Sequence, residues 1–316
     1  MNKTVYHYTS PDGILSILKN KTLRFTDCQY LNDASEFVYI SEPLDKEYKM
    51  VMLEYGETFK NIVEDFNTLL QSPYTSLGVE INPKKKQSAG SSITFKSYRY
   101  YVLCASENPD AINMWNYYSK NGIYQGYNLG IDCDHLKDCL NLNNTNDQIK
   151  FIEGKVIYDK KIQVEMIYKK AIDLLTIYKE NANKTNDNFH ESMCFNYFRD
   201  EMFGYINKQK LFFKNPAFAG EEEYRFVLQV DNRFFEDKES PINKKFKLDF
   251  RVGASGIITP FIEWKFNLTD KENMFKQITL APMIESTLAK ESFNRFLIST
   301  VRTKINIKQS SIKLRF

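Results

Sequence analysis

The chain has 316 residues, of which 42% are apolar and 15% aromatic, so it can form a large core without disulfides or structural metal ions. Its net charge of +3 is too small to indicate bulk binding to phosphates. No apolar run approaches the roughly 20 residues that cross a bilayer, and residues 1–8 lack the apolar stretch of a signal peptide, so we expect a cytoplasmic protein with no membrane partner.

The first elements read as a strand, a helix and a second strand. Residues 5–9 form the first strand. Ser10 is a side-chain cap, and Pro11 after it lacks the N–H group that would need one, so a helix begins here. Residues 22–26 return to strand character. The apolar face of the helix should comprise Ile14, Leu15, Ile17 and Leu18.

Two later stretches read as helical insertions between parts of a sheet. The first covers about residues 44–92, as a long helix or helical hairpin followed by a loop rich in Ser, Pro, Lys and Gly. The second covers about residues 160–206 and contains two amphipathic helices. There is no internal repeat and no linker between two composition classes, so we predict a single domain over residues 1–316.

The rest of the chain has mostly strand character, with one helix after Asn108 and another near 284–298. The strands and helices do not alternate as βαβ units, so we expect an α+β fold with mainly antiparallel sheets. The predicted strands are 98–106, 124–132, 154–158, 222–230, 245–250, 256–262, 276–281 and 300–316.

The cysteines indicate neither disulfides nor a redox site, because they are odd in number and no pair has C-x-x-C spacing. Two of them flank His135, which allows a metal-site interpretation, but a fourth ligand at regular spacing is missing. We therefore expect reduced, mostly buried thiols and no metal. The five are Cys28, Cys104, Cys133, Cys139 and Cys194.

A run of three acids leads into the strand at 222–230. In an extended chain Glu221, Glu223 and Arg225 point to one face of the strand, and Glu222 points to the other. This pattern fits either a solvated strand edge with an ion pair or a functional site.

Two further features carry candidate binding residues. His7 lies on the first strand, just before a helix N-terminus, where it is either structural or ligand-binding. Residues 104–118 lead from a strand end into a capped helix that carries Trp115, Tyr117 and Tyr118. Spare N–H groups at such a turn can hold an anion, and the rings can stack on a flat ligand. The alternative is that Trp115 simply packs in the core.

Taken together, these motifs resemble DUF2971, a bacterial family of unknown function. The resemblance extends from residue 6 to residue 281. The motifs that carry it are Tyr6-His7-Tyr8-Thr9-Ser10, Leu23-Arg24-Phe25, Leu31-Asn32-Asp33, Met114-Trp115 with Tyr118, and Glu221-x-Glu223-Tyr224-Arg225.

That family is distantly similar to ADP-ribosyltransferases, and the opening of the chain resembles DNA-modifying toxins of the DarT type. The similarity implies an ADP-ribosyltransferase-like split sheet, with NAD as substrate and no metal. It implies that Glu223 is the catalytic acid, with Glu221 beside it. The NAD-binding residues that it implies are His7, Tyr8, Thr9, Trp115, Tyr117, Tyr118 and Arg225.

The resemblance thus implies an NAD-dependent ADP-ribosyltransferase or NAD glycohydrolase, acting as a toxin or antiphage defence effector on a protein or nucleic-acid acceptor. A carboxylate at Glu223 would stabilise the positive charge that develops on the ribose. The alternative is a non-catalytic sensor module that binds a ligand or nucleic acid. A nuclease is disfavoured, because we find no cluster of metal-binding acids beyond Glu221 and Glu223.

Overall fold

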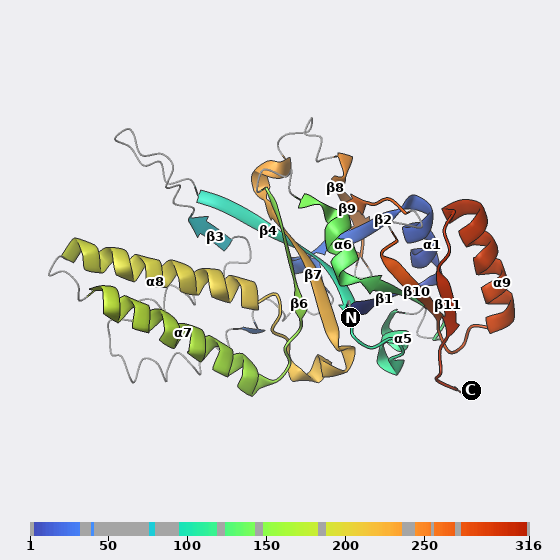
Figure 1. The fold of residues 1–316 in the computed structure, drawn as a ribbon, viewed down its shortest axis with the longest axis horizontal. Helices are drawn as coiled ribbons and strands as arrows, with labels where there is room; N and C mark the ends of the chain where they lie inside the picture. Colours follow the sequence, from blue (N-terminus) through green and yellow to red (C-terminus); the bar gives the residue numbers. More distant parts are fainter. Residues whose placement is uncertain are drawn as a thin grey trace. The chain divides into compact units, whose positions relative to one another are not determined.

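The computed structural model divides the chain into two compact units, which are drawn as ribbons in Figure 1. Unit 1 comprises Met1–Tyr30, Tyr100–Lys155 and Ala219–Phe316, and unit 2 comprises Leu31–Arg99 and Val156–Phe218. Most of the insertion predicted at 44–92 lies outside the residues that the structure describes. These are 3–31, 39–40, 76–79, 95–118, 124–142, 148–182, 188–235, 244–253, 256–268 and 273–314.

Unit 1 is built on a largely antiparallel sheet, which confirms the predicted α+β class. The strand order is β11-β10-β5-β1-β4-β2-β9-β8, and β7 pairs with both β4 and β6. The β10–β11 pair is parallel. That the strands form an ADP-ribosyltransferase-like split remains a prediction. The strands are β1 (Thr4–Thr9), β2 (Thr22–Asp27), β4 (Phe95–Ser106), β5 (Tyr127–Asp132), β6 (Ile149–Lys155), β7 (Glu223–Asp231), β8 (Phe246–Val252), β9 (Ile258–Lys265), β10 (Phe275–Leu280) and β11 (Asn306–Gln309).

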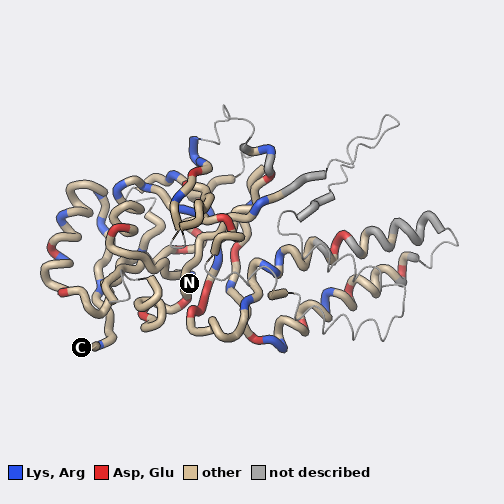
Figure 2. Tube along the Cα trace, turned by 180° about the vertical axis from the view of Figure 1, so that it is seen from behind, with Lys and Arg blue, Asp and Glu red and all other residues tan. Residues whose placement is uncertain are grey.

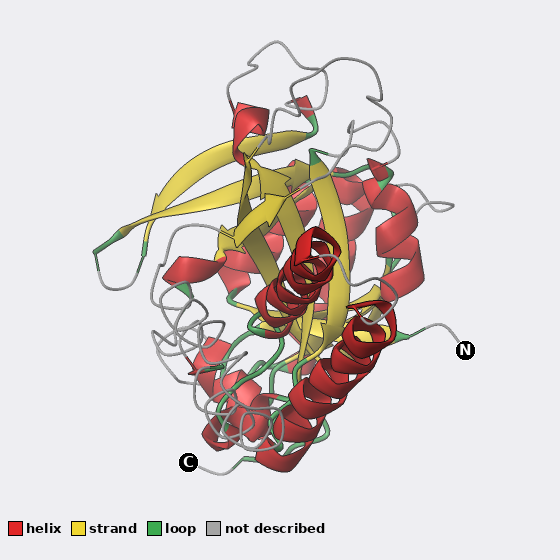
Figure 3. Cartoon of the chain, turned by 90° about the vertical axis from the view of Figure 1, so that its left-hand side faces the viewer, coloured by secondary structure: helices red, strands yellow, loops and turns green. Residues whose placement is uncertain are grey.

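The main core of unit 1 lies against one face of this sheet. Successive strand residues point to opposite faces, and Val5 and its cross-strand partner Ile131 both belong to this core. Tyr6 and Tyr8 therefore point away from it. Figure 3 draws the strands in yellow and the helices in red. The helices that contribute to the core are α1 (Pro11–Asn20), α6 (Cys133–Leu140) and α9 (Ser286–Phe296).

Helix α1 begins as predicted from its cap. The Ser10 hydroxyl accepts a hydrogen bond from the Gly13 N–H at 3.1 Å. Ile14 and Leu18 are fully buried, but Leu15 is exposed, so the predicted four-residue apolar face is too wide. One helical turn brings Ile14 and Leu18 onto the same side, whereas Leu15 lies about 100° further round.

Gly13 is required by the close approach of Thr9. A Cβ atom at position 13 would lie 2.1 Å from the Thr9 hydroxyl oxygen. We therefore expect Gly13→Ala to lower the melting temperature, although alanine normally favours a helix over glycine by about 1 kcal/mol. Gly204→Ala is the matched control, because a Cβ there meets nothing within 4 Å, and this variant should be stabilised. Thermal unfolding followed by circular dichroism measures the melting temperatures of both variants. The prediction is wrong if the two melting temperatures change in the same direction by similar amounts.

Three elements differ from the sequence prediction by more than a few residues at one end. Helix α6 was not predicted; it follows β5 without a linker, because the Asp132 carboxylate caps it by accepting from the His135 N–H at 3.0 Å. The strand predicted at 154–158 lies earlier, at β6, where it pairs along β7 from Ile149 to Lys155. The strand predicted at 300–316 is reduced to β11, because residues 297–301 continue α9 as a π-helical turn, which ends at Arg302 with its left-handed backbone (φ 59°).

Unit 2 contains two long helices, α7 (Lys160–Ala182) and α8 (Asn188–Gln209), which confirm the helix pair predicted for the second insertion. They pack on one another through residues such as Ile167 and Met202, and Figure 2 shows acidic and basic residues interspersed along them. The first insertion contains one described strand, β3 (Ser76–Val79), within its predicted loop. None of the described helices is both long and apolar enough to cross a membrane.

Candidate functional site

The candidate site is organised by the segment Ser106–Ala111, which we call the β4–α5 turn, because it joins β4 to α5 (Ile112–Tyr118). The Ser106 hydroxyl donates to the Glu221 carbonyl at 2.8 Å and accepts from the Asn108 N–H at 3.1 Å. The turn therefore fixes the chain that leads into β7.

The acidic run does not form one extended segment. Glu221 ends a 3-10 helix (Pro216–Glu221), and Glu222 has a left-handed backbone with φ 45°. Strand β7 begins only at Glu223. The prediction that Glu221 and Glu223 project from one strand face is therefore wrong, because the turn at Glu222 breaks the alternation.

Glu222 was not selected from the sequence, but it is the exposed acid of the run. Its carboxylate accepts from the Asn108 side-chain amide at 2.9 Å, and its carbonyl accepts from the Glu107 N–H at 2.8 Å. In an extended chain, its position indicated only that the Glu222 side chain points to the face opposite Glu221 and Glu223. The contacts with Asn108 and Glu107 depend on β4 and β7 lying together, which the sequence does not reveal.

Glu223 and Arg225 form a buried ion pair. The guanidinium donates to both carboxylate oxygens, from Nε at 2.8 Å and from Nη2 at 2.9 Å. The two residues are 3% and 2% exposed. Tyr224 and Phe226 belong to the main core, so Glu223 and Arg225 lie on the other face of the sheet. A two-pronged contact of this kind fixes the carboxylate in position.

Tyr8 and Trp115 pack together on that same face. Their ring centroids are 4.6 Å apart with an interplanar angle of 68°. The Tyr8 hydroxyl donates to the Asn108 carbonyl at 2.8 Å and accepts from the Ala111 N–H at 2.9 Å. Burial strongly raises the pKa of Tyr8. Tyr118 packs against this aromatic cluster, whereas Tyr117 is exposed.

Asp110 lies at the centre of the turn and was missed by the sequence analysis. Its carboxylate accepts from the Trp115 indole N–H at 2.8 Å, from the Ser310 hydroxyl at 2.7 Å, and from the backbone and side chain of Ser311. Burial opposes ionisation, but these hydrogen bonds outweigh it and hold the pKa of Asp110 below its usual value. The polar sequence Asn108-Pro109-Asp110 before a helix was the available signal.

His7 anchors β1 to β4. Its Nδ1 lies 2.8 Å from the Cys104 carbonyl, and because a carbonyl can only accept, Nδ1 carries the proton. Burial lowers the pKa of His7, and the bond to Cys104 only partly opposes this, so the ring is neutral with an acceptor lone pair at Nε2. Thr9, on the same side of β1, lies against Gly13.

The predicted site residues therefore fall into two groups. Tyr8, Trp115, Tyr118, Glu223 and Arg225 lie on the face away from the main core. His7 and Thr9 alternate with Tyr8 and lie on the core side. Strands β1 and β7 both pair with β4, so the two predicted strands belong to one sheet, separated by a single strand.

One buried acceptor lies beside the aromatic cluster. Asn128 is the cross-strand partner of Tyr8, and its side-chain amide donates to the Pro109 carbonyl at 2.7 Å. Its Oδ1 accepts no hydrogen bond from the described part of the chain.

Metal chemistry finds no support in the part of the chain that the structure describes. Within it, no three His, Cys, Asp or Glu side chains are grouped so that they could hold an ion. Cys133, Cys139 and His135 lie together on α6 but do not form such a group.

These features define an α+β protein in which the β4–α5 turn forms hydrogen bonds both with the acidic residues before β7 and with Tyr8 of the aromatic cluster. Residues 114–226 match the model of the family described as a protein of unknown function, DUF2971. This match over part of the chain supports the resemblance seen in the motifs. The matched segment contains Trp115 and the Glu223–Arg225 pair, whereas His7 lies outside it. No curated protein and no solved structure matches the chain.

Proposed function

We propose that the chain cleaves NAD, and either transfers ADP-ribose to an acceptor or releases it to water. The observation that carries the proposal is the Glu223–Arg225 pair at the start of β7, a strand that pairs with β4 beside β1. This arrangement brings the acidic motif and the opening motif into one sheet, but on β1 only Tyr8 shares the face of Glu223, so His7 and Thr9 are not part of the proposed site.

The fixed carboxylate suits this chemistry. Loss of nicotinamide leaves an oxocarbenium-like ribose, which a preorganised negative charge stabilises without reorganisation. In this proposal Arg225 holds Glu223 ionised and in place, and Glu223 provides that charge. Glu222 replaces Glu221 as the acid that orients an acceptor, because its carboxylate is exposed and positioned by Asn108.

Trp115 and Tyr117 have different roles in this proposal. Trp115 is fully buried and bonded to Asp110, so it supports the turn. Tyr117 is 61% exposed on the same helix, so it is the ring that can stack on nicotinamide or adenine.

A non-catalytic binding module is the second candidate. It is favoured by the fact that both carboxylate oxygens of Glu223 already contact Arg225 and the side chain is almost inaccessible. A carboxylate engaged in this way can serve structure alone.

Nicotinamide release from NAD separates the two candidates. We expect release by the wild-type protein, and at least a roughly tenfold loss in Glu222→Gln and in Tyr117→Ala without a change in melting temperature. Glu291→Gln on α9 is the control for removal of an exposed acid, and should not affect turnover. Binding of NAD without release of nicotinamide would establish the binding module, and absence of both would contradict both candidates.

A further inference from the structure

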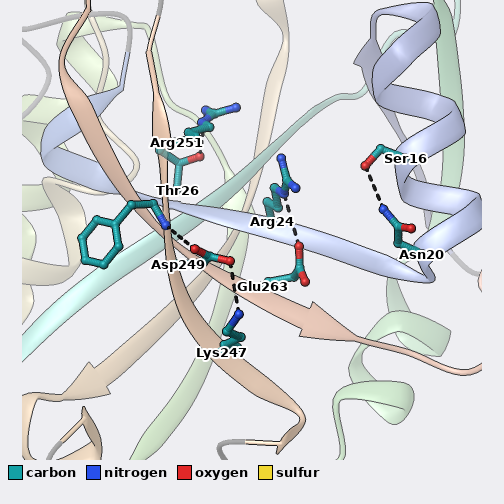
Figure 4. Close-up of polar contacts among 9 residues, drawn as sticks. Ser16, Asn20, Arg24, Thr26, Lys247, Asp249, Arg251 and Glu263 are labelled. Carbon is teal, nitrogen blue, oxygen red and sulfur yellow. Dashed lines mark hydrogen bonds and ion pairs between the residues drawn. The ribbon is translucent and has the colours of Figure 1, made fainter.

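A second polar cluster lies across β2, β9 and β8, on the face away from the main core. Leu23 and Phe25 of β2 belong to that core, so Arg24 and Thr26 point to the opposite side. The cross-strand partner of Thr26 on β9 is Phe261, and that of Phe261 on β8 is Asp249. Arg251, two residues beyond Asp249, shares this face. Figure 4 shows Arg251 of β8 beside Thr26 of β2, with Arg24 on the same strand as Thr26.

Arg251 is held without a counter-charge. Its Nη2 donates to the Thr26 hydroxyl at 3.3 Å. Within the described ranges no carboxylate lies at ion-pairing distance from its guanidinium. Partial burial and the positive charge of Arg24 both lower the pKa of Arg251. Arg24 and Arg251 therefore place two positive charges near one another on this face of the sheet.

The neighbouring acids act on Arg24 rather than on Arg251. Glu263 makes one contact with Arg24, from Nε at 3.4 Å. Asp249 instead contacts the Lys247 ammonium at 3.4 Å and accepts from the Phe250 N–H at 2.9 Å. The Arg24 guanidinium also lies 4.8 Å from the centre of the Phe261 ring, which orients it over the sheet.

We propose that Arg24, Thr26 and Arg251 form a binding site for a phosphate group, either free or at the end of a nucleotide. Two planar guanidinium groups provide paired N–H donors, and the threonine hydroxyl provides another, which matches the several oxygens of a phosphate. A phosphate group also supplies negative charge to Arg251, for which the described residues provide no ion-pairing acid, and it offers more oxygens than a carboxylate. The site does not depend on the proposed NAD chemistry.

Binding is measured as a rise in the unfolding temperature with phosphate at constant ionic strength, with chloride as the balancing anion. Tryptophan fluorescence is the suitable signal, because both tryptophans, Trp115 and Trp264, lie in unit 1 with the site. We expect Arg251→Met to weaken phosphate binding at least roughly tenfold. Arg295→Met on α9 removes an exposed arginine that is paired with Glu291, and should not affect binding.

A gain of binding provides a second test. Glu263→Gln removes the carboxylate that pairs with Arg24 and should therefore tighten phosphate binding. Glu291→Gln is the control, because it removes the carboxylate that pairs with Arg295 and makes the same change in net charge, but it should not affect phosphate binding. Without phosphate, Arg251→Met should melt no lower than the wild type, because it relieves the repulsion from Arg24. A lower melting temperature would indicate a structural role for Arg251 and contradict the proposal.

The source of the phosphate is distinguished by comparing inorganic phosphate, AMP and adenosine. If inorganic phosphate and AMP both bind in an Arg251-dependent way, the phosphate group alone is recognised. If only AMP does so, the ligand is a nucleotide. The proposal is overturned if neither binds, if adenosine binds as well as AMP, or if Arg251→Met binds phosphate as tightly as the wild type.

Discussion

Replacing Glu223 with glutamine is expected to lower the free energy of unfolding of unit 1 by about 3–5 kcal/mol. The reason is that Arg225, which is 2% exposed, keeps its charge and loses the carboxylate that receives the hydrogen bonds from its Nε and Nη2. A neutral amide accepts at one atom only, and its NH₂ group would face the guanidinium. Chemical denaturation followed by tryptophan fluorescence measures the change in unit 1.

Glu222→Gln is the matched control for this variant, because it makes the same chemical change one residue earlier at an exposed side chain. It should alter stability by less than about 0.5 kcal/mol. The double variant Glu223→Leu with Arg225→Met should recover most of the lost stability, since an apolar pair of similar volume leaves no buried charge. An unchanged midpoint in Glu223→Gln would show that the ion pair is not formed in solution.

The double variant also separates folding from chemistry. If the proposed function is correct, the folded double variant releases no nicotinamide, because the fixed carboxylate is gone. Release at the wild-type rate would remove Glu223 from the proposed mechanism while leaving its structural role intact.

Replacing Asp110 with alanine should destabilise unit 1 by at least about 1–3 kcal/mol, the cost of leaving the buried indole N–H of Trp115 without an acceptor. The loss of the bonds from Ser310 and Ser311 adds to this, because the same carboxylate holds the C-terminal segment against the turn. Denaturation followed by fluorescence measures both effects together, since Trp115 is itself a reporter.

Asp138→Ala on α6 is the control, because this exposed carboxylate makes no such contacts within the described residues, and its removal should change little. The stability that Asp110 provides also depends on pH. Its folded-state pKa is lowered, so its contribution is fully present above the unfolded value of about 4 and is lost as the pH falls through the folded value. The difference in free energy of unfolding between the wild type and Asp110→Ala should therefore become smaller as the pH falls below about 4. A difference that stays constant in acid would contradict the assigned role.

Local signals in the sequence were sufficient to predict many of the helices and strands. The Ser10 cap, the apolar spacing of Ile14 and Leu18, and the pattern of the two helices of unit 2 depend on residues within one or two turns of each other. The family was likewise recognisable, because its motifs are short runs of the chain. The prediction that Glu221 shares a strand face with Glu223 and Arg225 was wrong, because Glu222 adopts a left-handed backbone conformation that the sequence does not indicate.

The α+β class, the main helices and the residues worth testing could be read from the chain alone, because capping and periodicity are local properties. The contact of Glu223 with Arg225 through both carboxylate oxygens, the opposite faces of His7 and Tyr8 on β1, and the bond from Ser310 to Asp110 across 200 positions became visible in the folded molecule. Strand pairing and burial depend on packing between distant segments, and this packing sets the face, the exposure and the partners of each side chain.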